Sequence, residues 1–460
     1  MNGLYLLQSA AEQMAAAREG LGTPLPARLM GVVGMATMVG LAWLLSSHRK
    51  RVNWRLVGMG VLVQVFFGFL VLKTPFGRRL FEGANTVFIG LLGYTKQGAA
   101  FIFGNLVDTN VPVGLPTGTP LEGAPISSPE LWAHTGASFA FMVLPTIIFF
   151  SSLMSVLYYL GVMQWIVKGI AWIMQRTMKT SGAETLSVAG NIFVGQTEAP
   201  LLIRPFVGQM TYSELNTVMV GGFATIAGGV MAAYVGMLSP YFPDVAGHLL
   251  TASVMNAPAA LLISKLLVPE IGEPVTKSSL AVNVEKLEAN VIDAAAAGAA
   301  QGLKLALNVG AMLLAFIALI ALLNGLVGGL GSLFSHPELS LELIFGWVLS
   351  PLAALMGVPW ADATDVGSLI GIKIVVNEFV AYLQLASVMD GATVLSPRGT
   401  VIATYALLGF ANFSSIAIQI GGIGGIAPER RSDLSRLGLR AMIGGNLAAF
   451  MSASLAGMLL

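Results

Sequence analysis

Long apolar segments separated by short polar ones run through most of this 460-residue sequence. A membrane-spanning helix needs about 20 predominantly apolar residues. By that measure the pattern predicts eight spans, at 28–46, 56–73, 135–160, 215–238, 246–267, 303–330, 399–422 and 440–460. We therefore expect an all-α membrane protein with eight core transmembrane helices.

Two further apolar stretches are too interrupted to cross the membrane as simple helices. Residues 181–207 carry Gly195-Gln196-Thr197-Glu198 with Pro200 and Pro205 close behind, and residues 365–387 carry Asn377-Glu378. A carboxylate at the bilayer centre costs roughly 2.5–3.5 kcal/mol, so these glutamates indicate function. Irregular backbone at that depth must be covered by protein or line a water-filled cavity. The pattern predicts two re-entrant hairpins.

The segments that follow the two hairpins resemble each other. Gly222-Phe223-Ala224-Thr225 comes after the first hairpin and Gly409-Phe410-Ala411-Asn412 after the second, each inside an apolar run. Lys and Arg gather at 48–55, 168–179, 277–304 and 430–440, which the eight spans place on one side, the cytoplasm. The hairpins then enter from opposite faces, so the repeat is inverted, as in many secondary transporters. Both termini are expected outside.

Three segments stay outside the set of simple spans. Residues 79–94 follow basic residues and can form a helix at the membrane surface, 281–301 mix charged and apolar positions as a cytoplasmic amphipathic helix does, and 341–358 are apolar but contain Pro351. Residues 108–130, rich in Pro, Gly, Thr and Ser, predict an external loop.

Composition supports a membrane protein and excludes several other classes. Hydrophobic residues make up 55% and charged residues 10% of the chain, against about 25% charged in soluble domains. The net charge of +1 gives no reason to expect a nucleic-acid partner. The chain has no cysteine, which removes disulfides, thiolate metal sites and cysteine nucleophiles.

The polar residues expected near mid-membrane favour a neutral solute. They are Asn191, Gln196, Thr197, Glu198, Thr225, Glu378, Asn412 and Ser415. They supply carboxylates, amides and hydroxyls without a cluster of positive charge, which suits a solute with several hydroxyls and ring donors or acceptors. The oxygens of Asn191, Val194, Thr225 and Ile226 suit a coupling cation. Alternatively, Thr225, Asn412 and Ser415 serve only as hydrogen-bonding contacts between helices.

Three motifs carry a family resemblance. Gly195-Gln196-Thr197-Glu198-Ala199-Pro200-Leu201, Asn377-Glu378-Phe379-Val380-Ala381-Tyr382 and Gly409-Phe410-Ala411-Asn412-Phe413-Ser414-Ser415 together resemble the concentrative nucleoside transporters. The resemblance implies a homotrimer in which each protomer has a scaffold domain and an elevator-type transport domain. On this sequence it implies a lead-in at 1–27, scaffold spans at 28–180, the first transport half at 181–267, an interfacial helix and scaffold span at 268–340, and the second transport half at 341–460.

The same resemblance implies roles for individual residues. Gln196, Thr197 and Glu198 would contact the nucleobase, against which Val230 would pack. Glu378, Asn412 and Ser415 would hold the ribose hydroxyls, and Phe410 would line the pocket. Sodium would bind at Asn191, Val194, Thr225 and Ile226. The expected function is sodium-driven import of nucleosides such as uridine, by a protein embedded in the lipid of a bacterial inner membrane.

Other functions are weighed against this one. A carrier of the same fold could be driven by protons, with the proton on Glu198. An ion channel would want a filter or repeated rings of polar groups, which the inverted arrangement does not offer. An intramembrane enzyme could use paired carboxylates, but the sequence has no HExxH or serine-based motif. We therefore expect a transporter and not an enzyme.

Overall fold

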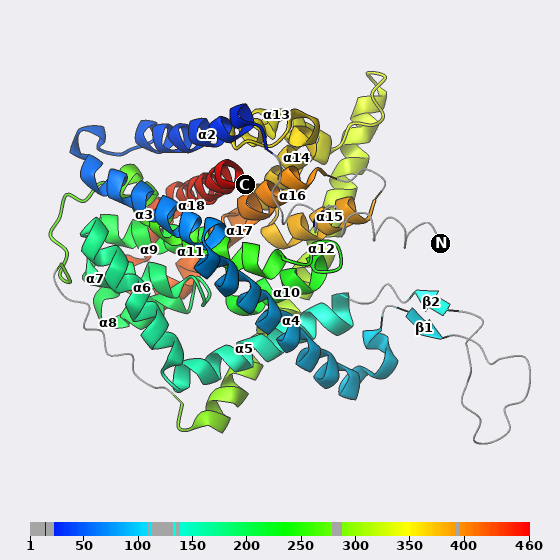
Figure 1. The fold of residues 1–460 in the computed structure, drawn as a ribbon, viewed down its shortest axis with the longest axis horizontal. Helices are drawn as coiled ribbons and strands as arrows, with labels where there is room; N and C mark the ends of the chain where they lie inside the picture. The colour runs from blue at the N-terminus through cyan, green and yellow to red at the C-terminus, as the bar shows by residue number, and fades with distance from the viewer. Residues whose placement is uncertain are drawn as a thin grey trace, which may run out of the picture.

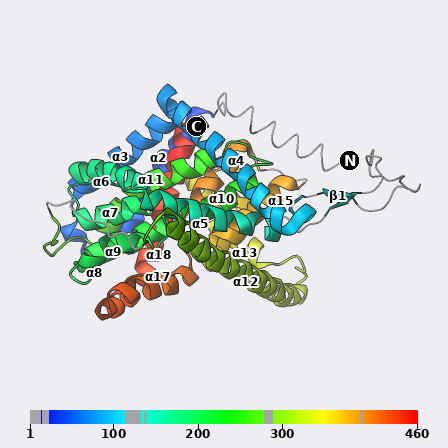
Figure 2. The same ribbon diagram turned by 90° about the horizontal axis from the view of Figure 1, so that it is seen from below.

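The computed structural model describes residues 14, 23–108, 110–112, 132–134, 139–277, 288–391 and 395–460. It is almost entirely helical (Figures 1 and 2), which confirms the predicted class. The exception is a ribbon of two short antiparallel strands, β1 (Asn110–Pro112) and β2 (Trp132–His134). The rest of the predicted loop 108–130, and most of the lead-in 1–27, lie outside the described residues.

The helices follow one another along the chain in a simple order. They are α2 (Leu25–Leu44), α3 (Trp54–Lys73), α4 (Pro75–Phe103), α5 (Leu144–Tyr159), α6 (Val162–Met178), α7 (Gly182–Gly190), α8 (Arg204–Val207), α9 (Tyr212–Ala224), α10 (Gly228–Leu238), α11 (Val245–Leu267), α12 (Val291–Ser332), α13 (Leu341–Leu355), α14 (Ala363–Val375), α15 (Glu378–Asp390), α16 (Pro397–Leu407), α17 (Phe413–Ile426) and α18 (Arg431–Leu459).

Among the described residues, eight helical segments are long and apolar enough to span a membrane. Seven of them overlap predicted spans. The prediction of one span at 399–422 was wrong, because that segment is two helices, α16 and α17. The eighth qualifying segment is Pro75–Val107. There the chain forms one long helix, α4, rather than a short one at 79–94, and Thr74 caps it by accepting from the Gly77 N–H at 3.0 Å.

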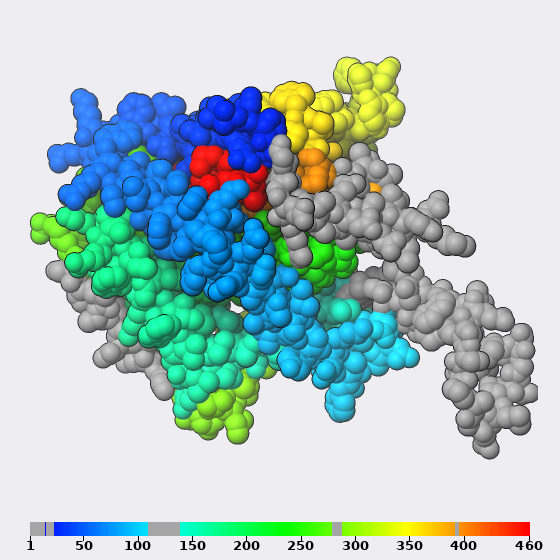
Figure 3. Space-filling model, viewed as in Figure 1, coloured from blue at the N-terminus to red at the C-terminus, as the bar shows by residue number. Residues whose placement is uncertain are grey.

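The spans differ sharply in burial. In Tyr212–Leu238 and Val245–Leu267, 89% of the most apolar window is buried, and in Pro428–Leu459 83% is. In Pro75–Val107 and Val291–Ser332 only 11% is buried. In the space-filling view the C-terminal residues, in red, show only a small patch between other helices (Figure 3). The molecule thus has an inner group of helices, α9–α11 and α18, and an outer group that exposes apolar side chains.

Helix α12 differs from its prediction. The sequence suggested an amphipathic helix at 281–301 followed by a span at 303–330, but the described part is one 42-residue helix. Residues 278–287 lie outside the described residues. The one residue between the two predicted parts is Gly302 rather than a proline, and it fits closely against α5, where a Cβ would lie 2.8 Å from the Ile148 Cα. At about 1.5 Å per residue, α12 is about 63 Å long.

Two hairpins are present, as predicted. Hairpin 1 (182–207) consists of α7, an irregular tip, a 3₁₀ turn at Ala199–Ile203 and α8. Hairpin 2 (363–390) consists of α14 and α15, which pack against each other across a short break. The unassigned segment 341–358 is mostly α13, which packs against α14. Each hairpin is followed by a broken helix: α9 and α10 after the first, α16 and α17 after the second.

The repeat is visible in side-chain contacts. Asn256 on α11 donates its side-chain N–H to the carbonyl of Ala224 at 2.6 Å, and Asn446 on α18 donates to the carbonyl of Ala411 at 2.9 Å. The repeat is not identical, because Gly-Phe-Ala ends α9 in the first half and lies in the break in the second. Gly409 there has φ +114°, and a Cβ on it would lie 2.5 Å from the Phe223 carbonyl oxygen. The two broken helices therefore touch at their breaks.

Candidate functional site

A large cavity lies between the hairpins, the broken helices and α12. Its volume is about 1160 Å³. All eight residues assigned to substrate by resemblance line it: Gln196, Thr197, Glu198, Val230, Glu378, Phe410, Asn412 and Ser415. These residues come from four regions far apart in the sequence: the tip of hairpin 1, α10, the start of α15, and residues 410–415. The fold therefore brings together what the motifs only suggested.

Glu378 lies at the centre of a network of donors. Its two carboxylate oxygens accept from the Tyr234 hydroxyl at 3.0 Å and from the Asn412 Nδ2 at 2.9 Å. Glu378 is the first residue of α15, where the helix dipole favours negative charge. Asn377 precedes it as the N-cap, accepting from the Val380 N–H at 2.9 Å. This buried carboxylate is fixed in place, and each of its oxygens keeps a lone pair with which it can accept from a ligand.

Asn412 has its orientation set by a second role. Its side-chain oxygen caps α17 by accepting from the Ser415 N–H at 2.9 Å and from the Ser414 hydroxyl at 2.7 Å. Its Nδ2 must therefore face Glu378, because a flipped amide would lose the cap. The carboxylate, the amide and the neighbouring Ser415 hydroxyl lie together, as expected for groups that bind vicinal hydroxyls.

Gln196 joins hairpin 1 to α17. Its Nε2 donates to the Ser415 hydroxyl at 3.3 Å, and its Oε1 accepts from the Gln419 Nε2 at 3.0 Å. Gln419 also donates to the Met219 carbonyl at 3.1 Å, so it links hairpin 1, α9 and α17. The tip of hairpin 1 is thereby fixed against the second half of the repeat.

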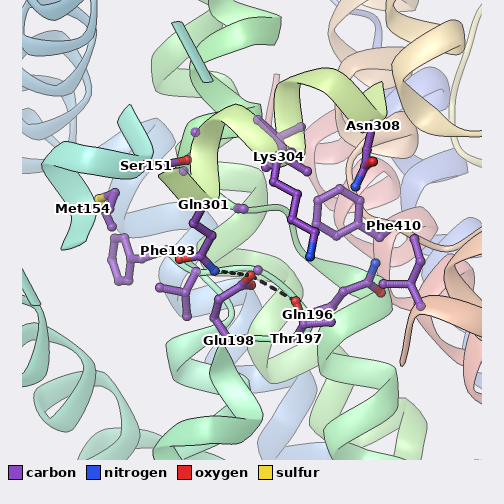
Figure 4. Close-up of a pocket in the computed structure, with 18 of the residues that line it drawn as sticks. Ser151, Met154, Phe193, Gln196, Thr197, Glu198, Gln301, Lys304, Asn308 and Phe410 are labelled. Carbon is purple, nitrogen blue, oxygen red and sulfur yellow. Dashed lines mark hydrogen bonds between the residues drawn. The ribbon is translucent and has the colours of Figure 1, made fainter. Parts of the chain in front are cut away.

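Glu198 lies in the cavity wall beside Thr197 and Gln301 (Figure 4). Its Oε1 accepts from the Thr197 hydroxyl at 3.0 Å and from the Gln301 Nε2 at 3.2 Å. Its Oε2 lies against Gly195, where a Cβ would come within 2.0 Å. The glycine of this motif is therefore needed for close approach of the carboxylate to the backbone.

Several residues of the site were missed by sequence reasoning. They are Tyr234, Gln301, Lys304, Asn308 and Gln419, of which Gln301, Lys304 and Asn308 line the cavity. Gln419 follows Ser415 by one helical turn, a signal that could have found it. Lys304 and Arg204 bring positive charge to the cavity wall. Lys373 on α14 is fully buried and donates to the carbonyls of Ala406 at 2.8 Å and Leu408 at 3.3 Å.

The four residues assigned to sodium lie where hairpin 1 meets the break between α9 and α10. The Gly228 N–H donates to the Phe193 carbonyl at 2.9 Å, which joins these two irregular segments. Asn191 is fully buried, and its Oδ1 has no hydrogen-bond partner. Within the described chain, the carbonyls of Val194 and Ile226 accept no backbone hydrogen bond either. Thr225 donates to the Gly221 carbonyl at 2.9 Å, which leaves its oxygen able to accept.

This donor set fits a hard monovalent cation. It offers neutral oxygens that lack partners at a helix C-terminus, where the dipole favours positive charge. Among the described residues there is no group of three or more His, Cys, Asp or Glu side chains of the kind a transition metal would need.

Comparison with known families identifies the same family as the sequence motifs do. Residues 33–106 match the Na+ dependent nucleoside transporter N-terminus, 248–457 match the C-terminus of the same family, and 140–241 match a nucleoside recognition region. The chain belongs to the sodium-dependent nucleoside transporter family. The expected resemblance is confirmed, and the family is one of transporters rather than enzymes.

Individual relatives cover nearly all of the chain. An uncharacterized transporter of Haemophilus influenzae is 46% identical over 94% of this chain and 97% of its own length. Sodium/nucleoside cotransporter 1 of Mus musculus is 42% identical over 94% of this chain, which spans 64% of that relative's length. CNTnw in an inward-facing substrate-bound state has a TM-score of 0.83 and 44% identity, with 94% of this chain and 98% of that chain covered.

Proposed function

We propose that this chain is a sodium-coupled symporter that imports nucleosides such as uridine. The observation that carries the proposal is the Tyr234–Glu378–Asn412 network, which offers acceptors and donors for vicinal hydroxyls in a buried site. The name of sodium/nucleoside cotransporter 1 of Mus musculus supports the same substrate class and ion.

The proposed binding mode divides the cavity into two ends. Glu378, Asn412 and Ser415 hold the ribose hydroxyls, with Phe410 lining the pocket. Gln196, Thr197 and Glu198 bind the base edge, and Val230 packs against the ring. Because buried polar groups left unpaired are costly, such a site rejects solutes that lack the hydroxyls.

Sodium is proposed to bind at Asn191, Val194, Thr225 and Ile226. Asn191 and Val194 shortly precede Gln196 in hairpin 1, and Thr225 and Ile226 lie in the break before α10. Helix α10 carries Val230 and Tyr234. An ion there would fix the hairpin tip against α10 and so complete the nucleoside site. One charge crossing 100 mV is worth roughly 2.3 kcal/mol, enough for about fortyfold accumulation.

The movement is proposed to be of the elevator type. Hairpins 1 and 2 with the inner helices would form the transport domain, and the outer helices, α12 among them, the scaffold. The cavity extends to Tyr159, Gln164 and Glu288, near the basic residues that predict the cytoplasmic side. We therefore assign this conformation as inward-open, with both termini periplasmic.

Assembly and location complete the proposal. The outer helices α4 and α12 expose many large apolar side chains, among them Phe101, Leu314 and Leu330. Such faces must be covered by lipid or by another copy of the chain. In a homotrimer embedded in a bacterial inner membrane, lipid and the neighbouring copies together would cover these faces.

Uptake of radiolabelled uridine into proteoliposomes tests the function. We expect an inward sodium gradient to drive accumulation, and replacement of sodium by choline at constant pH to reduce it at least about tenfold, consistent with the loss of the coupling energy. Uptake driven by a pH gradient without sodium would transfer the coupling to a proton, with Glu198 as its carrier. No uptake under either gradient, by folded and inserted protein, would contradict a nucleoside carrier.

The sodium site has its own prediction. Asn191→Ala removes one oxygen ligand and should raise the sodium concentration for half-maximal uptake roughly tenfold or more, as expected for a lost bond to a charged group. Ser187→Ala is the matched control, because Ser187 is equally buried one turn earlier and its carbonyl, which accepts from Asn191, is retained. An unchanged sodium dependence in Asn191→Ala would rule out this site.

A further inference from the structure

Helix α12 presents three polar side chains to the cavity. Gln301, Lys304 and Asn308 are three and four residues apart, a spacing that places side chains on one face of a helix. All three line the cavity (Figure 4). Between 302 and 323 the helix is otherwise apolar or glycine. The polar face is therefore confined to the part of α12 that lies opposite the tip of hairpin 1.

Gln301 makes a direct contact with Glu198 at the tip of hairpin 1. Its Nε2 donates to the Glu198 Oε1 at 3.2 Å, and the Thr197 hydroxyl donates to the same oxygen at 3.0 Å. Within the described chain, this is the only side-chain hydrogen bond between α12 and hairpin 1. The carboxylate is thus held from one side by its own hairpin and from the other by α12.

Helix α12 itself is held in place by α5. It packs along α5, where the Ser152 hydroxyl donates to the Ala295 carbonyl at 2.8 Å. A Cβ on Gly298 would lie 2.7 Å from the Ser151 carbonyl oxygen, so the backbones of α5 and α12 approach closely. The Gln301–Glu198 bond therefore joins a helix held by α5 to a hairpin held by α9 and α17.

We propose that Gln301 is a positioning residue for nucleobase recognition and that it acts from one side of the membrane only. The proposal rests on the nucleoside symport proposed above and on movement of hairpin 1 relative to α12. A hydrogen bond of this kind requires a separation of about 2.7–3.2 Å. A shift of the hairpin by even one helical turn, about 5.4 Å, would break it.

The consequence is an affinity that differs between the two faces. In the inward-open conformation Gln301 holds Glu198 toward the base end of the cavity. In the outward-open conformation Glu198 is held by Thr197 alone. Loss of Gln301 should therefore weaken binding from the cytoplasmic side and leave binding from the outer side unchanged.

The test is uridine transport by Gln301→Ala in right-side-out and in inside-out membrane vesicles, at equal sodium on both sides. In inside-out vesicles we expect KM to rise about two- to tenfold, the range of one net hydrogen bond. In right-side-out vesicles KM should stay within about twofold. Because Vmax/KM must be equal in the two directions without a driving gradient, Vmax in inside-out vesicles should rise in proportion.

The controls separate the possible failures. Gln97→Ala changes an exposed glutamine on α4 away from the cavity and should alter neither KM. Equal KM shifts on both faces, or no shift on either face, would overturn the one-sided role of Gln301 while leaving nucleoside transport intact. Absence of sodium-dependent uridine flux in the wild-type vesicles would instead refute the proposed function, and this inference with it.

Discussion

Glu378→Gln is expected to reduce uridine transport at low substrate concentration by roughly tenfold to a hundredfold or more. The substitution keeps the size of the side chain but removes the charge and one acceptor oxygen. A hydrogen bond to a charged group contributes about 1.5–3 kcal/mol, and each 1.4 kcal/mol corresponds to a factor of ten. The measurement is the initial rate of radiolabelled uridine uptake in proteoliposomes under a sodium gradient.

The fold should survive this change. The amide oxygen of glutamine can accept from Asn412, whose orientation is fixed by its cap on α17. The amide N–H can donate to the Tyr234 hydroxyl, which can reverse its own role. Position 378 thus keeps its two protein partners but loses the charge and the second acceptor oxygen that we propose bind the ribose hydroxyls.

Glu342→Gln is the matched control. Glu342 on α13 also accepts from an asparagine, the Nδ2 of Asn324 at 2.8 Å, but it does not line the cavity. We expect wild-type uptake from this variant. Full uridine uptake by a well-folded Glu378→Gln protein would show that the carboxylate does not bind the substrate.

The sequence predicted the hairpins and the polar residues that line the cavity because polar side chains in an apolar context are costly. Glu198 and Glu378 stand out for that reason, and the short motifs around them carry the residues that line the cavity. The repeat was also readable, since Gly-Phe-Ala recurs in both halves. The Asn256 and Asn446 contacts give that resemblance a physical basis, because each amide binds the same carbonyl of the repeated motif.

Other features could not be predicted from the sequence, because they depend on contacts between segments that lie far apart along the chain. The break at 408–412 interrupts an apolar run that reads as one helix, and it forms where Gly409 meets the end of α9. The continuity of α12 depends on its close packing against α5. Gln301 belongs to a segment predicted to lie on the cytoplasmic surface, and only the folded chain shows that it reaches Glu198.

A second large effect is expected in stability, at a buried ion cluster that joins three helices. The Lys265 Nζ on α11 lies 2.8 Å from the Glu184 Oε2 on α7 and 3.0 Å from the Glu270 Oε2 beyond α11. It also donates to the Ser213 hydroxyl on α9 at 3.0 Å. Lys265 and Glu184 are 6% and 1% exposed, so water cannot replace either partner. The cluster fixes the first helix of hairpin 1 to the two inner helices.

Lys265→Met should therefore lower the free energy of unfolding by about 3–5 kcal/mol, because it leaves the Glu184 carboxylate buried without a counter-charge. The measurement is the midpoint of thermal unfolding in detergent.

Glu270→Gln should cost less than about 1 kcal/mol, since Glu270 is 24% exposed and solvent weakens its pairing. Adding Glu184→Gln to Lys265→Met should recover most of the loss: glutamine can still accept from the Ser181 N–H, as Glu184 does at 2.9 Å, and carries no charge. A double variant no more stable than Lys265→Met alone would show that the lysine stabilises the fold through its packing rather than its charge.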